Sequence, residues 1–252
     1  MQRLLLTLRY DGTQYHGWQV QPNGVTVQQR MQDAIEKITG VRSGLTGCSR
    51  TDAGVHANMF CCAFNTESPL RGTRMVRALN ANLPQDIAVY DCREVDDKFH
   101  PRYHAEGKRY VYRIWNSTAR NPFWQPYSLF RNQPLDVARL QRAAQDYVGT
   151  HDYAAFCSAG SSVEDTVRTV RTCTVHRVGE MVLFTVEADG FLYNMVRIMV
   201  GTLLDMANGR IAYDAIPAIL QQKDRNRAGI TAPPQGLFLD YVFYPSAALG
   251  NT

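Results

Sequence analysis

The sequence predicts an α+β protein made of two similar halves. Each half contains several strand patterns with helical patterns between them, and the outline of the first half recurs after Arg131. No regular strand-helix-strand rhythm with a glycine-rich first turn is present, which disfavours a doubly wound parallel sheet. The 252 residues are 45% hydrophobic and 20% charged, so the chain has the composition of a globular protein with a substantial core.

The first half opens with strand, loop and helix. An apolar run over residues 3–10 predicts a strand that ends at the turn signal Asp11-Gly12. Apolar residues from Val27 to Ile38 then recur at helical spacing up to Gly40. Further strands are expected at residues 59–64, 87–92 and 108–115, with a helix over residues 74–79.

The second half repeats this outline. Helical spacing from Leu135 to Tyr147 is followed by strand patterns at residues 167–178 and 181–188. Residues 191–206 are apolar on more than one face, which predicts a buried helix, and Arg197 is its only charge before Asp205. The polar, proline-containing stretch 116–134 is the expected linker, so we divide the chain into an N-terminal half, residues 1–115, and a C-terminal half, residues 116–252.

Membrane and metal-binding classes are not indicated. The N-terminal apolar run over residues 4–8 is too short for a signal peptide or a membrane span, so a cytoplasmic protein without a membrane partner is expected. The six cysteines show neither a C-x-x-C pair nor zinc-site spacing, which predicts reduced, mostly buried thiols. His100 and His104 are separated by Pro101 and lack an adjacent third ligand, so no metal site is expected.

The basic residues are mostly arginine, 23 of the 27. Arginine suits bidentate recognition of phosphate. A solvated surface and coding preference give the same composition, so charge alone does not identify a nucleic-acid partner.

Residues 49–57 form the most unusual local sequence, a polar segment between two apolar, cysteine-containing stretches. In an extended segment Arg50 and Asp52 leave the same side of the backbone and can pair, which would keep the carboxylate ionised in a partly buried site. An ionised, desolvated carboxylate is a usable nucleophile. The alternative is that Asp52 only begins a turn at Ala53-Gly54 and caps backbone N–H groups there.

Residues 108–115 combine aromatic and basic side chains. Alternation sends Tyr110, Tyr112 and Ile114 to one face of the expected strand and Arg109, Val111 and Arg113 to the other. Such faces suit stacking on RNA bases and holding phosphates, although tyrosines in a sheet core with arginines in solvent give the same pattern. Arg197 either extends to water or is held by a carboxylate, for which Asp52 is one candidate.

These segments resemble the TruA family of tRNA pseudouridine synthases, and the similarity runs nearly end to end. The most specific segment is Arg50-Thr51-Asp52-Ala53-Gly54-Val55-His56-Ala57. The others are Tyr10-Asp11-Gly12, Tyr15-His16-Gly17-Trp18-Gln19-Val20-Gln21, Thr26-Val27-Gln28, Asn80-Ala81-Asn82-Leu83-Pro84 with Asp86-Ile87, Phe99-His100, Arg109-Tyr110-Val111-Tyr112, Phe191-Leu192-Tyr193-Asn194-Met195-Val196-Arg197 with Gly201, and Ala232-Pro233 with Gly236-Leu237.

The resemblance implies a fold, a reaction and its residues. The expected fold is two α/β-sandwich halves with mainly antiparallel sheets, related by a pseudo-twofold axis and facing a central RNA-binding cleft. The implied reaction is isomerisation of uridine to pseudouridine in the anticodon stem-loop of tRNA, at tRNA positions 38–40, by a cytoplasmic homodimer without cofactor or metal. Its residues would be Asp52 as nucleophile, Tyr110 for stacking or proton relay, and Arg50 and Arg197 around Asp52. Because the uridine must be held out of its stack, we also expect a substrate-binding role for His56, Tyr110, Arg109 and Lys108.

One position departs from the family pattern. The family usually has glycine before the motif arginine, and this chain has Ser49, which raises the question of the loop's backbone conformation. A non-catalytic RNA-binding protein is the first alternative, with Ser49 as its only support. A glycosidase or nucleoside hydrolase is the second, but it needs a second positioned carboxylate as general acid, and none is near Asp52 in the sequence.

Overall fold

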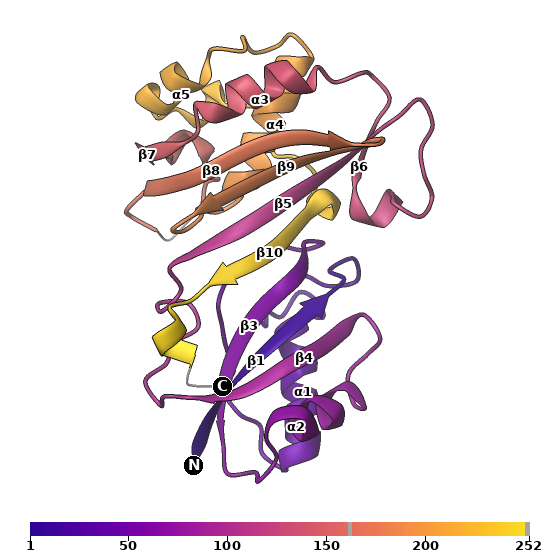
Figure 1. The fold of residues 1–252 in the computed structure, drawn as a ribbon, viewed down its shortest axis with the longest axis vertical. Helices are drawn as coiled ribbons and strands as arrows, with labels where there is room; N and C mark the ends of the chain where they lie inside the picture. The colour runs from indigo at the N-terminus through magenta and orange to yellow at the C-terminus, as the bar shows by residue number, and fades with distance from the viewer. Residues whose placement is uncertain (161–162, 250–252) are drawn as a thin grey trace. The chain divides into compact units, whose positions relative to one another are not determined.

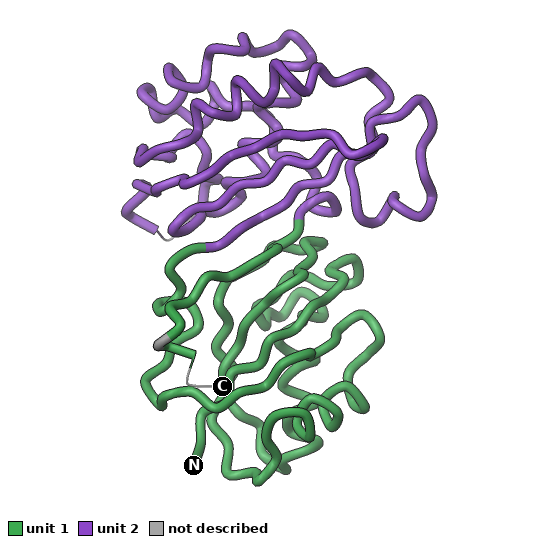
Figure 2. The backbone as a smooth tube through the Cα atoms, viewed as in Figure 1, with its two compact units in different colours: residues 1–107, 238–252 green, residues 108–237 purple. Residues whose placement is uncertain are grey.

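The computed structural model describes residues 1–160 and 163–249, and the chain divides into two compact units (Figures 1 and 2). Unit 1 comprises residues 1–107 together with the C-terminal segment from Phe238 onwards, and unit 2 comprises residues 108–237. The division expected at residues 115 and 116 falls inside a strand, β5 (Gly107–Asn116), which pairs along its length with a strand of unit 2. The α+β class expected from the sequence is confirmed by both units.

Unit 1 is a sheet with helices. Its strands are β1 (Gln2–Tyr10), β2 (Thr46–Gly47), β3 (His56–Thr66), β4 (Ile87–Val95) and β10 (Leu237–Phe243), and its helices are α1 (Val27–Thr39) and α2 (Gly72–Asn80). The strand order is β4-β1-β3-β10; β1 pairs antiparallel with both β3 and β4, and β10 joins the start of β3 in parallel. A register shift between Leu8 and Tyr10 leaves an extra residue in β3, close to where that strand begins.

Unit 2 is likewise a sheet with helices. Its remaining strands are β6 (Leu129–Arg131), β7 (Gly149–Asp152), β8 (Val167–Val178) and β9 (Met181–Ala188), and its helices are α3 (Val137–Gln145), α4 (Met195–Ala207) and α5 (Ile216–Gln222). The order β5-β9-β8-β7 is antiparallel throughout, and β6 adds to the end of β5 in parallel. Nearly all of α4 is buried, which confirms the buried helix expected from the apolar sequence in this region.

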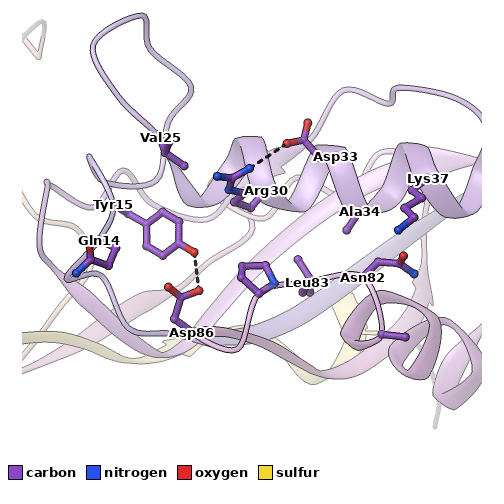
Figure 3. Close-up of a pocket in the computed structure, with 12 residues that line it drawn as sticks. Gln14, Tyr15, Val25, Arg30, Asp33, Ala34, Lys37, Asn82, Leu83 and Asp86 are labelled. Carbon is purple, nitrogen blue, oxygen red and sulfur yellow. Dashed lines mark hydrogen bonds and ion pairs between the residues drawn. The ribbon is translucent and has the colours of Figure 1, made fainter.

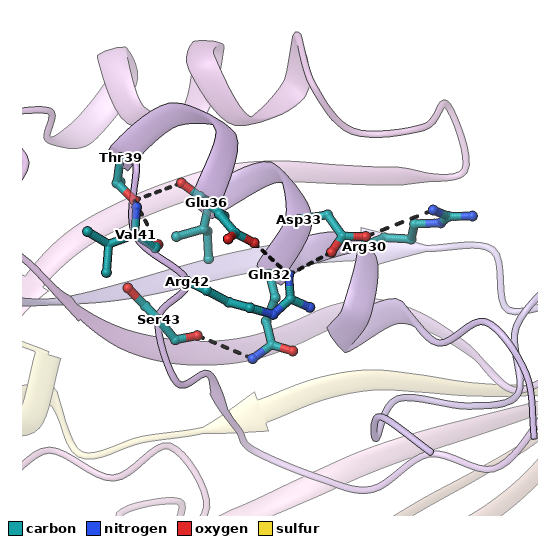
Figure 4. Close-up of polar contacts among 9 residues, drawn as sticks. Arg30, Gln32, Asp33, Glu36, Thr39, Val41, Arg42 and Ser43 are labelled. Carbon is teal, nitrogen blue, oxygen red and sulfur yellow. Dashed lines mark hydrogen bonds and ion pairs between the residues drawn. The ribbon is translucent and has the colours of Figure 1, made fainter. Parts of the chain in front are cut away.

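Helix α1 has defined ends that lead into the loop before β2. The Thr26 hydroxyl accepts from the Gln29 N–H at its start, and Gly40 adopts the left-handed conformation (φ 74°) just after its end. Beyond Gly40, the Arg42 guanidinium bonds the carboxylates of Asp33 and Glu36 at 2.9 and 2.7 Å (Figure 4). These side chains are half exposed, so the pairs fix the path of the loop more than they stabilise the unit.

Two expected elements differ in the structure. The helix expected over residues 191–206 begins only at Met195, because Asn194 adopts a left-handed backbone conformation (φ 60°) that interrupts the helical path. Strand β10 was not expected, because its apolar pattern is short and its strand conformation depends on pairing with β3, far away in the sequence. The strands expected at residues 167–178 and 181–188 are confirmed as β8 and β9.

Among the described residues, no helix combines the length and the apolar character that crossing a membrane requires. All six cysteines lie in the described part of the chain as free thiols, and all but Cys157 are buried. Burial raises the pKa of the Cys92 thiol to about 11, so this cysteine stays neutral at physiological pH. Mostly buried thiols are thus confirmed.

A segment of unit 2, residues 229–232, packs directly on α4. A Cβ at Gly201 would lie 1.7 Å from the Ile230 carbonyl oxygen, so only glycine permits this approach. Thr202 accepts from the Gly229 N–H at 2.9 Å, and the buried Asp205 carboxylate accepts from the Ile230 N–H at 3.1 Å. The path of this segment therefore depends on the surface of α4.

Replacing Gly201 by alanine is expected to lower the free energy of unfolding by roughly 1–3 kcal/mol or more, because the added methyl displaces the Ile230 carbonyl. Helix propensity alone would change it in the opposite direction, by about 1 kcal/mol. Gly44→Ala is the matched control, since its Cβ would meet nothing within 4 Å. Urea unfolding measures both variants, and a Gly201→Ala protein as stable as the Gly44→Ala protein contradicts the close approach.

Candidate active site

The candidate residues fall in both units. Arg50, Asp52 and His56 belong to unit 1, and the candidates on β5 and α4 belong to unit 2. In unit 1 the candidates lie on or beside the loop that connects β2 to β3.

Asp52 begins a backbone turn. The Val55 N–H donates to the Asp52 carbonyl oxygen at 3.2 Å, and Gly54 adopts φ 76° at the third position of the turn. That conformation favours glycine and is typical of a type II turn. The turn at Ala53-Gly54, which was expected if Asp52 has only a structural role, is therefore present. Its closing hydrogen bond is accepted by the main-chain carbonyl of Asp52. The Asp52 side chain is half-buried.

The expected pair of Arg50 and Asp52 is wrong for the protein as described. Arg50 is exposed and makes no ion pair with any residue that the structure describes. The expectation assumed an extended strand with alternating sides, whereas residues 48–52 lie in an irregular loop between β2 and β3. Ser49, in the place where the family usually has glycine, is not among the residues with positive φ. The substitution thus imposes no left-handed strain on the loop.

A second loop, residues 11–18 between β1 and α1, lies directly against the Asp52 turn. A Cβ at Gly12 would lie 2.0 Å from the Val55 carbonyl oxygen, and one at Gly17 would lie 2.3 Å from the Thr51 carbonyl oxygen. The two backbones therefore approach more closely than any side chain allows. We call residues 11–18 the support loop.

Hydrogen bonds fix the turn to the support loop along its length. The Trp18 N–H donates to the Thr51 carbonyl at 3.1 Å, and the Gly54 N–H donates to the Tyr15 carbonyl at 3.2 Å. The buried hydroxyls of Tyr10 and Thr51 lie 2.7 Å apart. Because a buried backbone group left unpaired costs free energy, these bonds favour one conformation of the turn.

His56 follows the turn and lies in the interior of unit 1. Its side chain is 1% exposed, and its ring stacks on Phe238 of β10 with centroids 4.6 Å apart. The Gly12 N–H donates to its Nδ1 at 3.0 Å, and the same Nδ1 lies 3.1 Å from the Asp11 carboxylate, an ion pair only when the imidazole is protonated. These contacts give His56 a part in holding the support loop. A contact of His56 with RNA remains a prediction.

In unit 2, β5 alternates as expected, with Tyr110, Tyr112 and Ile114 buried on one face. Tyr112 is fully buried, and its hydroxyl donates to the Pro233 carbonyl at 2.8 Å. For Tyr112 and Ile114 the core interpretation is therefore correct, and this part of the face is not a platform for bases. Tyr110, 6% exposed, meets Phe191 edge to face at 5.0 Å, which fixes the plane of its ring.

Two basic candidates flank Tyr110 in the sequence. Arg109 lies opposite Glu187 in the register of β5 and β9 and forms an ion pair with it at 3.2 Å. Lys108 is half-buried at the start of the strand. Neither position by itself identifies a partner.

Arg197, in the first turn of α4, has its guanidinium held within unit 2. Its Nε donates to the Ala232 carbonyl at 2.7 Å, and an Nη1 hydrogen donates to the Asn194 side-chain oxygen at 2.8 Å. Asn194 in turn donates to the Ser158 hydroxyl at 2.9 Å. Asn194, in its left-handed conformation, thus sets where α4 begins and also orients Arg197. The sequence did not predict either role of Asn194.

The support loop was also missed as a site component. Its glycines are visible in the sequence, Gly12 in the turn signal after Tyr10 and Gly17 directly before Trp18, but the sequence does not tell which backbone the glycines approach. Among the described residues, no group of three or more His, Cys, Asp or Glu side chains is arranged to hold a metal ion.

Comparison with known proteins covers both units. A family model described as tRNA pseudouridine synthase matches residues 7–104 and 143–245. The chain is 45% identical over 244 residues to "tRNA pseudouridine synthase A" of Thermoanaerobacter sp. (strain X514), covering 97% of this chain and 100% of that protein. It is 46% identical to the protein of the same name from Acetivibrio thermocellus over the same shares of each chain. A chain of a solved Cbf5-Nop10-Gar1 complex aligns at 12% identity with a TM-score of 0.39, covering 98% of this chain and 60% of that one, a similarity too low to establish a shared fold.

Gly17→Ala and Gly40→Ala form a matched pair that tests the support loop. Both glycines have φ near the left-handed value, 80° and 74°, so each alanine costs about 1–2 kcal/mol in backbone strain. Only the Gly17 Cβ would meet the Asp52 turn, whereas nothing lies within 4 Å of a Cβ at Gly40. Amide hydrogen exchange should show loss of protection at Gly54 and Val55 in Gly17→Ala alone. Equal protection of the turn in both variants would count against the support loop.

Proposed function

The chain belongs to the TruA family of tRNA pseudouridine synthases, and from this premise we propose that Asp52 is the carboxylate with which it isomerises uridine to pseudouridine in tRNA. Membership makes the protein an isomerase of tRNA uridine. The observation that carries the assignment to Asp52 is the turn itself. A main-chain carbonyl closes it and two glycine contacts hold it, so the half-buried carboxylate is presented by a rigid frame.

The reaction sets the demands on this site. The bond between N1 of uracil and the ribose breaks, the base turns, and C5 bonds to the same sugar carbon; N1 gains a proton and C5 loses one. The uridine must therefore leave its stack and be held while the free base turns. Asp52 either adds to C6 of the base or assists departure of the base at the sugar, and in each case it must be ionised and fixed in place.

The other candidate residues are proposed in supporting roles. Tyr110, whose ring plane is fixed by Phe191, stacks on the base or relays a proton. Arg197, held by Ala232 and Asn194, is proposed to orient the Asp52 carboxylate and keep it ionised. Arg50 is exposed and unpaired among the described residues, which leaves it available near Asp52 when RNA binds.

Lys108, Arg109 and His56 are proposed to bind the substrate and help hold the uridine out of its stack. Arg109 would have to exchange its partly buried partner Glu187 for a phosphate. His56 would need the support loop to shift before its ring could reach RNA, since it is 1% exposed.

The substrate position and the assembly rest on the resemblance to the family. On that basis we propose that the uridines lie in the anticodon stem-loop, at tRNA positions 38–40, that two copies of the chain form a homodimer, and that the protein acts in the cytoplasm without a cofactor or metal. The two halves proposed from the sequence, residues 1–115 and 116–252, would supply Asp52 and Arg197 respectively.

Asp52→Asn is expected to lower formation of pseudouridine in unmodified tRNA transcripts at least about a thousand-fold, because the amide removes the charge but keeps the shape. Affinity for tRNA and the free energy of unfolding should stay close to those of the wild type. Asp97→Asn, the same change at an exposed carboxylate of unit 1, is the control and should turn over normally. A mass-spectrometric count of pseudouridine gives the readout, and retained turnover in Asp52→Asn would falsify the assignment.

A further inference from the structure

A hollow of about 650 Å³ lies in unit 1 between α1, the support loop and the loop before β4 (Figure 3). Tyr15 and Asp86 belong to its lining, and their side chains point toward each other across it. The Tyr15 hydroxyl donates to the Asp86 carboxylate at 2.5 Å. The lining carries as many acidic as basic side chains, Arg30 and Lys37 against Asp33 and Asp86, so its charge selects no ligand.

Asp86 holds the support loop at two points. Its main-chain carbonyl accepts from the Asp11 N–H at 2.9 Å, at the start of the loop. Its carboxylate accepts from the Tyr15 hydroxyl, and between these points the Tyr15 N–H donates to the Gly12 carbonyl at 3.0 Å. The tight turn from Gly12 to Tyr15 is therefore clamped from outside at both ends.

Tyr15 connects this clamp to the Asp52 turn. Its side chain bonds Asp86, while its own carbonyl accepts from the Gly54 N–H, two residues after Asp52. The residue is 6% exposed, so displacing it requires opening the interior of the unit. Burial, and the bond to the Asp86 carboxylate, raise the pKa of the Tyr15 hydroxyl well above its usual value, so it remains a donor throughout the physiological range.

We propose that Tyr15 and Asp86 are positioning residues for the Asp52 carboxylate. The expected effect on turnover rests on the proposed function, whereas the expected effect on the conformation of the turn does not. Neither residue needs to touch the uridine. Their hydrogen bond fixes the Tyr15 carbonyl, and through the Gly54 N–H it fixes the turn that presents Asp52. Since a displacement of about 1 Å at a reacting group can cost on the order of a hundred-fold in rate, the bond bears on turnover more than on binding.

Tyr15→Phe removes the hydroxyl and keeps the ring. We expect kcat for pseudouridine formation to fall roughly ten- to hundred-fold, with KM and tRNA affinity within about two-fold of the wild type. In Asp86→Ala we expect a comparable fall in kcat. The double variant should show no further fall in kcat, because both single changes remove the same bond. Asp86→Asn retains an acceptor oxygen, so its kcat should fall less than that of Asp86→Ala.

Tyr244→Phe is the matched control for a general loss of stability. Its hydroxyl donates to the Pro101 carbonyl at 2.7 Å in the same unit, remote in sequence from the Asp52 turn and the support loop. Compared at equal fractions of folded protein, it should retain wild-type kcat. Amide hydrogen exchange adds a readout that does not depend on catalysis: protection of the Gly54 N–H should fall in Tyr15→Phe and persist in Tyr244→Phe.

The outcomes separate the two proposals. An active wild type with unchanged kcat and Gly54 protection in Tyr15→Phe overturns the positioning role and leaves the proposed function standing. Equal losses of kcat in Tyr15→Phe and Tyr244→Phe also overturn it, since stability alone would then explain both. A wild type that makes no pseudouridine overturns the proposed function, while the Gly54 exchange still decides whether Tyr15 fixes the turn.

Discussion

The close approach of two backbones, at Gly12 and Gly17 on one side and residues 51–55 on the other, is the constraint on which the rest of the proposed site depends. A Cβ at either glycine would lie within 2.3 Å of a carbonyl oxygen of the Asp52 turn. Because the strands that carry these loops, β1 and β3, are hydrogen-bonded neighbours, the sheet brings the loops together and the glycines let them touch. The backbone of the turn that carries Asp52 is thus fixed by main-chain contacts.

A close approach of two backbones at a glycine also occurs in unit 2. Gly201 lets the segment at residues 229–232 lie on α4, and the Ala232 carbonyl in that segment then binds Arg197. In both units a backbone approach that only glycine permits holds the segment that carries or contacts a charged side chain proposed for the reaction. This accounts for these glycines of the family motifs in physical terms: they support the residues proposed to act. Ser49, beside the motif arginine, has no positive φ, so that position needs no such freedom.

The sequence predicted those features that are set by local periodicity. The alternation along β5, the bounds of β8 and β9 and the burial of α4 follow from side-chain spacing. It could not predict features that depend on distant partners. Strand β10 exists through its pairing with β3, the pair of Arg50 and Asp52 assumed a strand where the chain is irregular, and the roles of Gly12, Tyr15 and Asn194 depend on what lies opposite them. The assignment of Asp52 came from the motif, and it stays a prediction.

Position-resolved mapping of pseudouridine tests the central claim most directly. The purified chain would be incubated with unmodified tRNA transcripts, and every new pseudouridine mapped along the RNA beside a reaction without protein. The account predicts new pseudouridines confined to the anticodon stem-loop, with no free base released. Absence of pseudouridine from every transcript would contradict it, and release of free uracil would show instead that the carboxylate serves hydrolysis of the glycosidic bond.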